Sequence, residues 1–264
     1  MNVYSDVFHY RELLGNLFRR DLQAKYRGSA LGVLWTIANP VMLMGVYLLV
    51  FGVVWKSPFA ASDHYALFLL SGLALWTFFA AAVQSATRSM LDNANLIRKT
   101  RFPRQLVPLS VVFAHVVSFG AMLVVLLAIN FVVLPRARAT EWLAIPLCAL
   151  FVGVVCGLGL LFASMNVLFR DVEFIVAALL VPWFFLTPIL YGLNTVAAHH
   201  AHVVWVIHWV NPLSPAVQAV RAPLFLGKLP HWTDALYLVV SCAISLALGA
   251  FVFSRIDDQI AIEV

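Results

Sequence analysis

The sequence predicts an all-α integral membrane protein with six membrane-spanning helices, and composition is the first observation behind this prediction. Of its 264 residues, 63% are apolar and 11% are charged, and the mean hydropathy is +0.93. A typical soluble chain is about half apolar and about a quarter charged, so this chain could not cover its surface with polar side chains. The second observation is a set of six uncharged apolar runs, each of roughly the 20 residues that cross a hydrocarbon core.

The distribution of charge along the chain is the third observation. The predicted spans cover residues 30–55, 66–87, 106–134, 142–169, 174–193 and 235–254. Most of the 17 Lys and Arg residues fall before the first span, after the second, after the fourth or after the last. The positive-inside rule therefore places both termini in the cytoplasm, and the net charge of +5 is a topology signal rather than a sign of nucleic-acid binding. The whole chain, 1–264, is predicted to be one transmembrane domain.

The N-terminal segment, residues 1–29, precedes the first span and predicts a basic amphipathic helix. Its apolar residues recur at helical spacing: Tyr10, Leu13, Leu14, Leu17, Phe18 and Leu22. We expect this helix to lie in the headgroup plane on the cytoplasmic face. Two interpretations stay open. The helix is an anchor for anionic lipid, or Arg19, Arg20, Lys25 and Arg27 also line an entrance for an anionic, lipid-linked molecule.

Inside the first span, Asn39-Pro40 predicts a kink. None of the six spans contains Lys, Arg, Asp or Glu, and His115 is the one imidazole well inside a span. Ion-driven carriers usually keep an intramembrane carboxylate, and the sequence also lacks a G-x-x-x-x-G-K-[ST] phosphate loop. The energy for any transport must therefore come from another chain. His115 is either a helix-packing residue bonded to a carbonyl or small polar neighbour, or a proton relay.

The connection at 88–105 and the region at 194–234 are the two remaining features. In the first, Asp92 is predicted to cap a short helix of about two turns that ends before Pro103. This helix is a natural lever, and the alternative is an ordinary basic loop. In the second, closely spaced prolines predict two short re-entrant helices, with Arg221 near the outer mouth. The histidines His199, His200 and His202 have metal-binding character, but we expect no metal site there.

Four blocks of sequence resemble the membrane subunit of ABC-2 type polysaccharide exporters, which export O-antigen, teichoic acid and capsule chains. They are YRGSALGVLWTIANP (26–40), NANLIRKTRFPRQLVPLS (93–110), LFRDVEFIVAALLVPWFFLTPILY (168–191) and NPLSPAVQAVR (211–221). The resemblance implies the ABC-2 (type V exporter) fold. It implies a homodimer with two copies of a separate ATPase, which holds the ATP and Mg, so that this chain is a permease subunit without a cofactor or enzymatic activity. The implied cargo is a lipid-linked polysaccharide on an undecaprenyl-type carrier, with O-antigen favoured, and the implied location is the inner membrane.

The resemblance also implies roles for particular residues. In the family, the segment matching the 88–105 connection is a coupling helix that docks on the ATPase: Leu91, Asp92, Asn95, Leu96, Ile97, Arg98, Lys99, Arg101 and Phe102. The N-terminal helix acts as a cytoplasmic gate, with headgroup contacts at Arg19, Arg20, Lys25, Tyr26 and Arg27. The region before the last span acts as the periplasmic gate: Trp205, Trp209, Asn211, Pro212 and Arg221.

Aromatic residues in the first and fifth spans form a candidate channel lining. They are Tyr47, Phe51 and Trp55, which share one helix face, and Trp183, Phe184, Phe185 and Tyr191. Sugar rings stack on aromatic side chains, and shallow uncharged sites let a polymer slide. The resemblance favours this interpretation, because these two spans border the channel in the family. The alternative for any single aromatic residue is helix packing or lipid contact.

Two other functions stay open at this stage. An ABC-2 exporter of a small amphiphile or drug would have the same architecture with a closed apolar pocket. An intramembrane transferase acting on lipid-linked sugars would need an acid or base at the outer surface, where the sequence offers Asp63, Glu141, Asp234 and His208 on separate connections.

Overall fold

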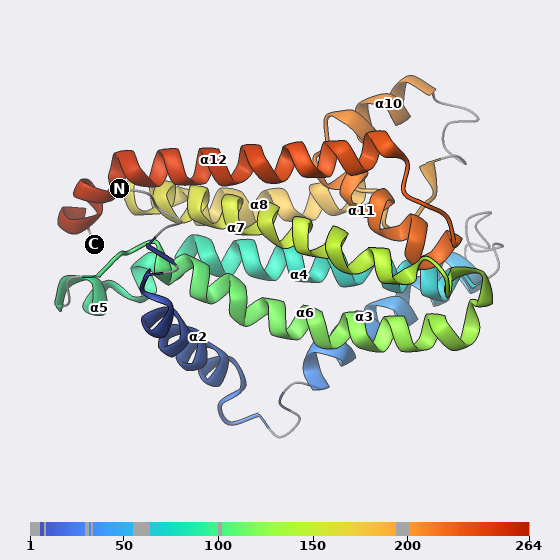
Figure 1. The fold of residues 1–264 in the computed structure, drawn as a ribbon, viewed down its shortest axis with the longest axis horizontal. Helices are drawn as coiled ribbons and strands as arrows, with labels where there is room; N and C mark the ends of the chain where they lie inside the picture. Colours follow the sequence, from blue (N-terminus) through green and yellow to red (C-terminus); the bar gives the residue numbers. More distant parts are fainter. Residues whose placement is uncertain are drawn as a thin grey trace.

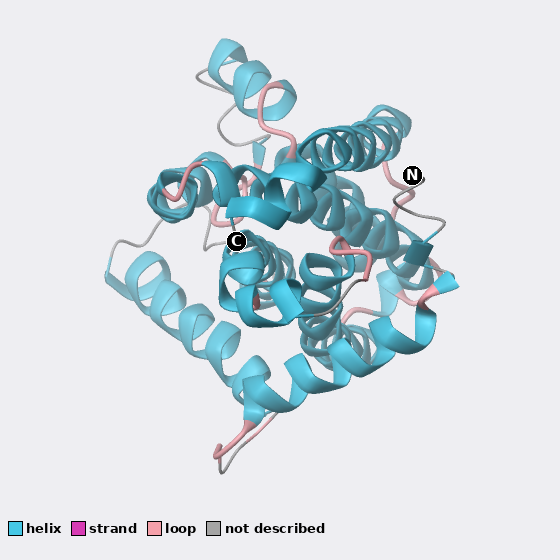
Figure 2. Cartoon of the chain, turned by 90° about the vertical axis from the view of Figure 1, so that its left-hand side faces the viewer, coloured by secondary structure: helices cyan, strands magenta, loops and turns pink. Residues whose placement is uncertain are grey.

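The computed structural model describes residues 6–7, 9–29, 32, 34–54, 64–99, 102–193 and 201–263. Every regular element in this part of the chain is a helix, as the sequence predicts. The long helices lie side by side along the longest axis of the molecule (Figure 1). Seen from the end, they form one group of packed helices (Figure 2). The result is a helical bundle with one principal core.

Four helices are long and apolar enough to cross a membrane: α4 (Tyr65–Asp92), α6 (Leu106–Val133), α7 (Ala144–Leu168) with the short η4 (Glu141–Leu143) before it, and α12 (Trp232–Glu263). They coincide with the predicted spans at 66–87, 106–134, 142–169 and 235–254. These four span predictions are confirmed by helix length and composition.

The other two predicted spans are less regular. α3 (Leu34–Tyr47) contains Pro40 and changes at Leu48 into a π-helical segment, η1 (Leu48–Val54). The departure from regular α-helix thus comes two turns after Pro40. α8 (Asp171–Leu186) begins earlier than predicted and ends at Leu186 rather than near residue 193. Its end is local, because Thr187 precedes a proline and takes an extended conformation. The count of six spans stays a prediction.

α4 is the central helix of the bundle. It packs against α3, α6, α7 and α8, and its buried face includes Phe78, Phe79, Ala82 and Ala86. Small residues let helices approach closely in a membrane protein. α7 and α12 show this most clearly, since a Cβ on Gly157 would collide with the backbone at Ser245.

Short helices cover one end of the bundle. α10 (Ala201–Trp209) projects from it, whereas α11 (Leu213–Arg221) and the following η5 (Ala222–Leu226) lie against the long helices, near η3 (Pro135–Ala137) (Figure 1). Within the region predicted to re-enter the membrane, the described residues therefore do form two short α-helices. Their insertion into the outer leaflet stays a prediction.

The opposite end carries α2 (Arg11–Tyr26) and α5 (Ala94–Lys99), and α12 ends beside them (Figure 1). α2 is amphipathic as predicted, with Leu17 buried. Its predicted place in the headgroup plane stays a prediction. The helix runs obliquely along α6, because its apolar face packs on that helix.

Candidate functional site

The short helix α5 follows α4 almost directly, and its start differs from the prediction. Asp92 is the last residue of α4 and pairs with Arg88 at 3.2 Å. Asn93, not Asp92, occupies the junction: its carbonyl accepts the first hydrogen bonds of α5, and its side chain donates to the carbonyl of Ser89 at 2.8 Å. The capping role assigned to Asp92 is therefore wrong. Its carboxylate is held by Arg88 one turn earlier on the same helix.

The predicted coupling residues divide between the inside and the outside of the molecule. Ile97 is buried in the core cluster and fixes α5 to the bundle. Asp92, Asn95, Arg98 and Lys99 are exposed, and the remaining members are half-buried: Leu91, Leu96 and Phe102. Arg101 lies outside the described residues. α5 therefore exposes a basic, polar face, and its buried Ile97 fixes it to the bundle.

Three hydrogen bonds tie the N-terminal segment to α6. Gln105, 1% exposed at the start of α6, donates to a carboxylate oxygen of Asp6 at 2.9 Å. Further along, Ser110 donates to Asp21 at 2.6 Å, and Nζ of Lys25 donates to the Ser118 hydroxyl at 2.7 Å. Residues later in the N-terminal segment bond to residues later in α6, from Gln105 at its start to Ser118. α2 is thus held along its length.

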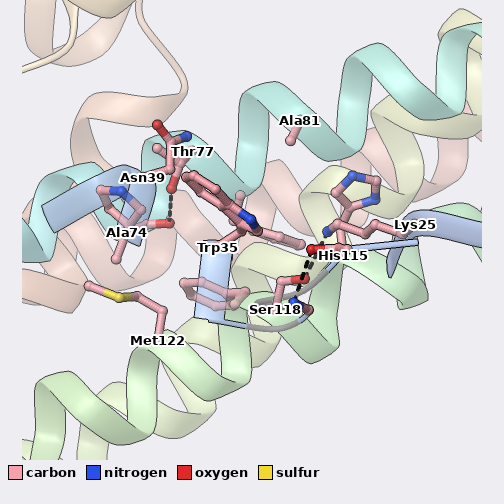
Figure 3. Close-up of a pocket in the computed structure, with 14 residues that line it drawn as sticks. Lys25, Trp35, Asn39, Ala74, Thr77, Ala81, His115, Ser118 and Met122 are labelled. Atoms are coloured by element: carbon pink, nitrogen blue, oxygen red, sulfur yellow. Dashed lines mark hydrogen bonds between the residues drawn. The ribbon is translucent and has the colours of Figure 1, made fainter. Parts of the chain in front are cut away.

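Two cavities meet beside Lys25. One, of about 350 Å³, lies between α3, α4 and α6, and its walls include Trp35, Thr77, Ser118 and Met122 (Figure 3). The other, of about 860 Å³, lies between α2, α4 and α6. Lys25, Ala81 and His115 line both.

His115 is hydrogen-bonded as the packing interpretation expects. Its Nδ1 lies 3.0 Å from the carbonyl oxygen of Val111 and its Nε2 lies 3.5 Å from the Ser85 hydroxyl. Val111 lies one turn earlier on the same helix, α6, and Ser85 belongs to α4. The same ring lines the two cavities, so His115 both packs between the helices and forms part of the cavity lining.

Only some of the predicted gate residues reach these cavities. All four cations are exposed, but only Arg20 and Lys25 line these cavities, and Arg19 and Arg27 belong to neither lining. The side chain of Tyr26 lies outside the described residues. Burial lowers the pKa of Lys25 to about 8. The structure thus singles out Lys25 within the predicted cluster.

Four of the predicted channel aromatics, Tyr47, Phe51, Phe184 and Phe185, form one connected cluster of rings. Tyr47 stacks on Phe184 at a centroid distance of 5.8 Å, and Phe51 lies 6.2 Å from Tyr47. Phe184 also contacts Phe185 at 5.2 Å. Phe184 is buried, Phe185 is exposed, and Tyr47, Phe51, Trp183 and Tyr191 are half-buried. Trp55 lies outside the described residues. α3 and α8 are therefore neighbours, joined by these rings.

The break after α8 is held by both ends of the motif at 211–221. Asn211 accepts a hydrogen bond from the Trp183 indole at 2.8 Å and donates to the Thr187 hydroxyl at 3.0 Å. Arg221 donates to the carbonyl oxygens of Pro188 at 2.7 Å and Ile189 at 3.2 Å. These carbonyls lie where the helix can no longer satisfy them. The motif is thus a brace for the end of α8.

Arg221 is a buried residue, and its predicted place near an outer mouth stays a prediction. Its exposed fraction is 2%, and its guanidinium lies 3.7 Å from the centroid of the Phe68 ring. It also donates to the Ser71 hydroxyl and the Phe68 carbonyl of α4, both at 3.3 Å. α11 thus turns the side chain of Arg221 into the bundle, against α4. Of the other predicted periplasmic residues, Trp205 is exposed and Trp209 is half-buried.

The outer acid and base candidates are partly brought together. Nε2 of His208 lies 2.9 Å from a carboxylate oxygen of Asp234, with both side chains mostly buried. This pair joins α10 to the start of α12. Asp63, His199 and His200 lie outside the described residues, and the described part of the chain contains no cluster of three or more potential metal ligands.

Several structural residues escaped the sequence analysis. Gln105, Asn166 and Ser71 are buried, and Asn166 accepts the backbone N–H of Glu173 at 3.0 Å, which caps the start of α8. An available signal was the occurrence of amide side chains at the ends of apolar runs. Buried polar groups nearly always have hydrogen-bond partners. Each such residue therefore predicts a tertiary contact, but the sequence does not show which residue is the partner.

Comparisons with known proteins agree with this architecture. The sequence model of the ABC-2 type transporter family matches residues 12–225. The O-antigen export system permease protein RfbA of Myxococcus xanthus is 33% identical over 251 residues, which cover 94% of this chain and 92% of that protein. The protein of the same name from Klebsiella pneumoniae is 30% identical over 253 residues, 95% and 94% of the two chains. The polysialic acid transport protein KpsM of Escherichia coli is 22% identical over 248 residues, 92% of each.

Proposed function

Because this chain belongs to the ABC-2 type transporter family, we propose that it is the membrane subunit of an ATP-driven exporter of a lipid-linked polysaccharide. The observation that supports the cargo most directly is end-to-end similarity, at 30–33% identity, to permeases named for O-antigen export. Similarity to a polysialic acid transport protein points to the same class of substrate. O-antigen on an undecaprenyl-type carrier is therefore the proposed cargo, and the inner membrane is the proposed location, with both termini in the cytoplasm.

The proposed motor is a separate ATPase, present in two copies, that binds the ATP and Mg. The sequence has no phosphate loop of its own. α5 supports this proposal, since its exposed Arg98 and Lys99 stand on a helix anchored by buried Ile97. A helix fixed in this way can transmit a movement of the ATPase to the rest of the bundle.

A homodimer that encloses a channel is the proposed working unit. Irregular backbone at membrane depth is tolerated where protein or a water-filled path covers it. The π-helical segment η1 and the break after α8 are both irregular, and the Tyr47–Phe184 contact makes α3 and α8 neighbours. This side of the protomer is therefore the proposed interface and channel side, with exposed Phe185 the best placed to meet sugar.

The proposed gates lie at the two ends of this path. α2, held along α6 by Asp21 and Lys25, is the cytoplasmic gate. α10 and α11, which follow the broken end of α8, form the periplasmic gate. Asn211 joins them to α8 through Trp183.

ATP hydrolysis by the reconstituted complex tests the proposal. The purified chain alone should hydrolyse no ATP, and its cognate ATPase should gain activity and export glycan when the chain is present. Arg98→Glu with Lys99→Glu should lower both, whereas Lys228→Glu, an exposed cation remote in sequence from α5, should not. ATP turnover by the lone chain, or full coupling in the α5 variant, would overturn the proposal.

The alternatives predict different outcomes in the same system. For a small-amphiphile exporter, Phe185→Ala should reduce transport of short and long cargo equally, whereas a polymer path should lose long glycans first. For a transferase, the His208–Asp234 pair supplies a base, so His208→Gln should abolish glycan transfer without any need for ATP.

A further inference from the structure

We propose that Arg136 and Arg138 bind an anionic phospholipid of the surrounding membrane, at the end of the bundle opposite α2 and α5. The phosphodiester of the lipid contacts the two guanidinium groups, and its acyl chains lie along the exposed apolar faces of α6 and α7. On the predicted topology this end lies in the outer leaflet. The proposal concerns membrane lipid and not the exported cargo, so it does not rest on the proposed function.

The two arginines are exceptions to the charge distribution of the chain. Arg136 lies in η3, which follows α6, and Arg138 comes directly after η3. The predicted topology places this connection outside, whereas most Lys and Arg residues lie in segments predicted to be cytoplasmic. Positive charge at this end works against the positive-inside rule. Topology therefore does not account for it, and a local interaction is expected.

Each guanidinium is oriented by a carbonyl and by an aromatic ring. Nε of Arg136 donates to the carbonyl oxygen of Phe225 at 3.3 Å, and Cζ lies 5.2 Å from the centroid of the same ring. Nε of Arg138 donates to the carbonyl oxygen of Phe131 at 2.6 Å, and Cζ lies 5.1 Å from that ring. Both arginines are exposed. Among the described residues neither pair of Nη groups has a hydrogen-bond partner, and paired N–H groups of this kind bind phosphate bidentately.

The balance of charge at this turn favours an anion. Segment 131–145 holds two arginines and one carboxylate, Glu141. Within the described part of the chain, neither arginine forms an ion pair with Glu141 or with any other acidic residue. Asp234, at the same end of the bundle, is held by His208 at 2.9 Å. A phosphodiester, with one negative charge, would balance the charge that remains.

The apolar surface next to the arginines favours a lipid over a free anion. Val132 at the end of α6 and Ile145 at the start of α7 are exposed. Trp142 is 60% exposed, and its indole donates to the carbonyl oxygen of Ala139 at 2.9 Å. A tryptophan with one bonded polar end and an exposed ring is typical of the membrane–water interface. The arginines thus lie at the level where headgroup phosphates are found, and a phospholipid matches both the charge and the apolar faces.

Photo-labelling of the purified full-length chain tests the site without ATPase or glycan. The probes are phosphatidylglycerol and phosphatidylethanolamine with the same diazirine-bearing acyl chain, each added in mixed detergent micelles. Both contain a phosphodiester, but only phosphatidylglycerol has a net negative charge. Peptide mass spectrometry should find segment 131–145 labelled several times more strongly by phosphatidylglycerol. Equal labelling by the two lipids would overturn the proposal.

Variants identify the residues that bind. Arg136→Gln with Arg138→Gln should lower phosphatidylglycerol labelling of segment 131–145 about tenfold, because charge-assisted hydrogen bonds are lost. Arg255→Gln is the matched control and should leave this labelling unchanged. Arg255 is also exposed, with Cζ 5.2 Å from the Phe251 ring, but it lies near the opposite end of α12.

The unfolding midpoint in lipid-free detergent separates lost binding from lost folding. It should be the same for wild type, the double variant and Arg255→Gln. Arg138→Gln alone should lower the labelling by a smaller factor, and it provides the test if the double variant unfolds. Labelling of these arginine variants equal to that of wild type would contradict the proposed site.

Discussion

Nη1 of Arg221 donates a 2.7 Å hydrogen bond to the carbonyl oxygen of Pro188, so a guanidinium from α11 closes the open end of α8. The same side chain reaches Ile189 and, on α4, Phe68. One buried cation thus joins three helices through backbone carbonyls. Because carbonyl dipoles stabilise the charge, no carboxylate is required at this position.

Arg221→Met should strongly destabilise the protein, because the carbonyls of Pro188 and Ile189 would be left buried without a donor. The expected loss is about 3 kcal/mol, at the upper end for an orphaned buried polar group. Thermal unfolding in detergent measures it, with Arg138→Met as the exposed control. A midpoint equal to that of the control would contradict the proposed brace.

Gly72→Ala should destabilise the protein through the same contact from the other side. A Cβ at this position would collide with Nη2 of Arg221 and crowd Ile189, which costs about 1–3 kcal/mol in a packed interior. Gly120→Ala, where a Cβ meets nothing within 4 Å, is the matched control. Similar unfolding midpoints for the two variants would show that Arg221 can move away freely.

The Trp183–Asn211 hydrogen bond should appear as a coupling energy. Trp183→Phe removes the indole donor, Asn211→Ala removes the acceptor, and the double variant should be more stable than the sum of the two losses predicts. We expect a coupling of about 1 kcal/mol, as for a typical buried hydrogen bond. Purely additive losses in urea titrations would mean that the 2.8 Å contact contributes nothing to stability.

Gln105→Ala should loosen the N-terminal segment without unfolding the bundle. The variant loses the 2.9 Å bond to Asp6, so amide hydrogen exchange should rise over residues 6–26, while exchange in α7 and α12 stays unchanged. Gln23→Ala, an exposed change on α2, should leave exchange as in wild type. Unaltered exchange in Gln105→Ala would show that the bond from Gln105 does not hold the N-terminal segment in place.

Lys25 should react with amine reagents at a lower pH than an ordinary lysine. Only the neutral amine is nucleophilic, and burial lowers the pKa of Lys25 from 10.5 to about 8, so its neutral fraction should reach half near pH 8. Labelling between pH 6 and 10, read by peptide mass spectrometry in lipid-free detergent, measures this midpoint. A midpoint near 10.5 would show that the neighbouring helices do not desolvate the Lys25 amine.

The long helices could be predicted because their causes are local. A run such as 106–134 needs only apolar side chains and sufficient length to become a spanning helix, and α6 (Leu106–Val133) has nearly these bounds. α8 was harder. Its apolar run continues to residue 193, but the conformation before Pro188 ends the helix at Leu186.

The residues of the candidate site show the same division. The amphipathic pattern around Leu17 located α2, yet nothing in it indicated that the helix would lie along α6, with Lys25 at Ser118. The stripe of Tyr47 and Phe51 was visible from spacing, whereas its contact with Phe184 depended on how α3 and α8 meet. Asp92 has the sequence context of a helix cap, but its carboxylate pairs with Arg88 on the preceding turn of α4.

Composition and the period of the apolar residues were thus enough to establish a membrane-embedded helical bundle with an amphipathic N-terminal helix, since these properties depend on each segment and its solvent. Folding was needed to assign partners. Asn211 and Arg221 are ten positions apart in one motif, and the bundle places both on the broken end of α8. That pairing arises because carbonyls left unpaired at a helix end must find donors, and packing alone determines which donors are within reach.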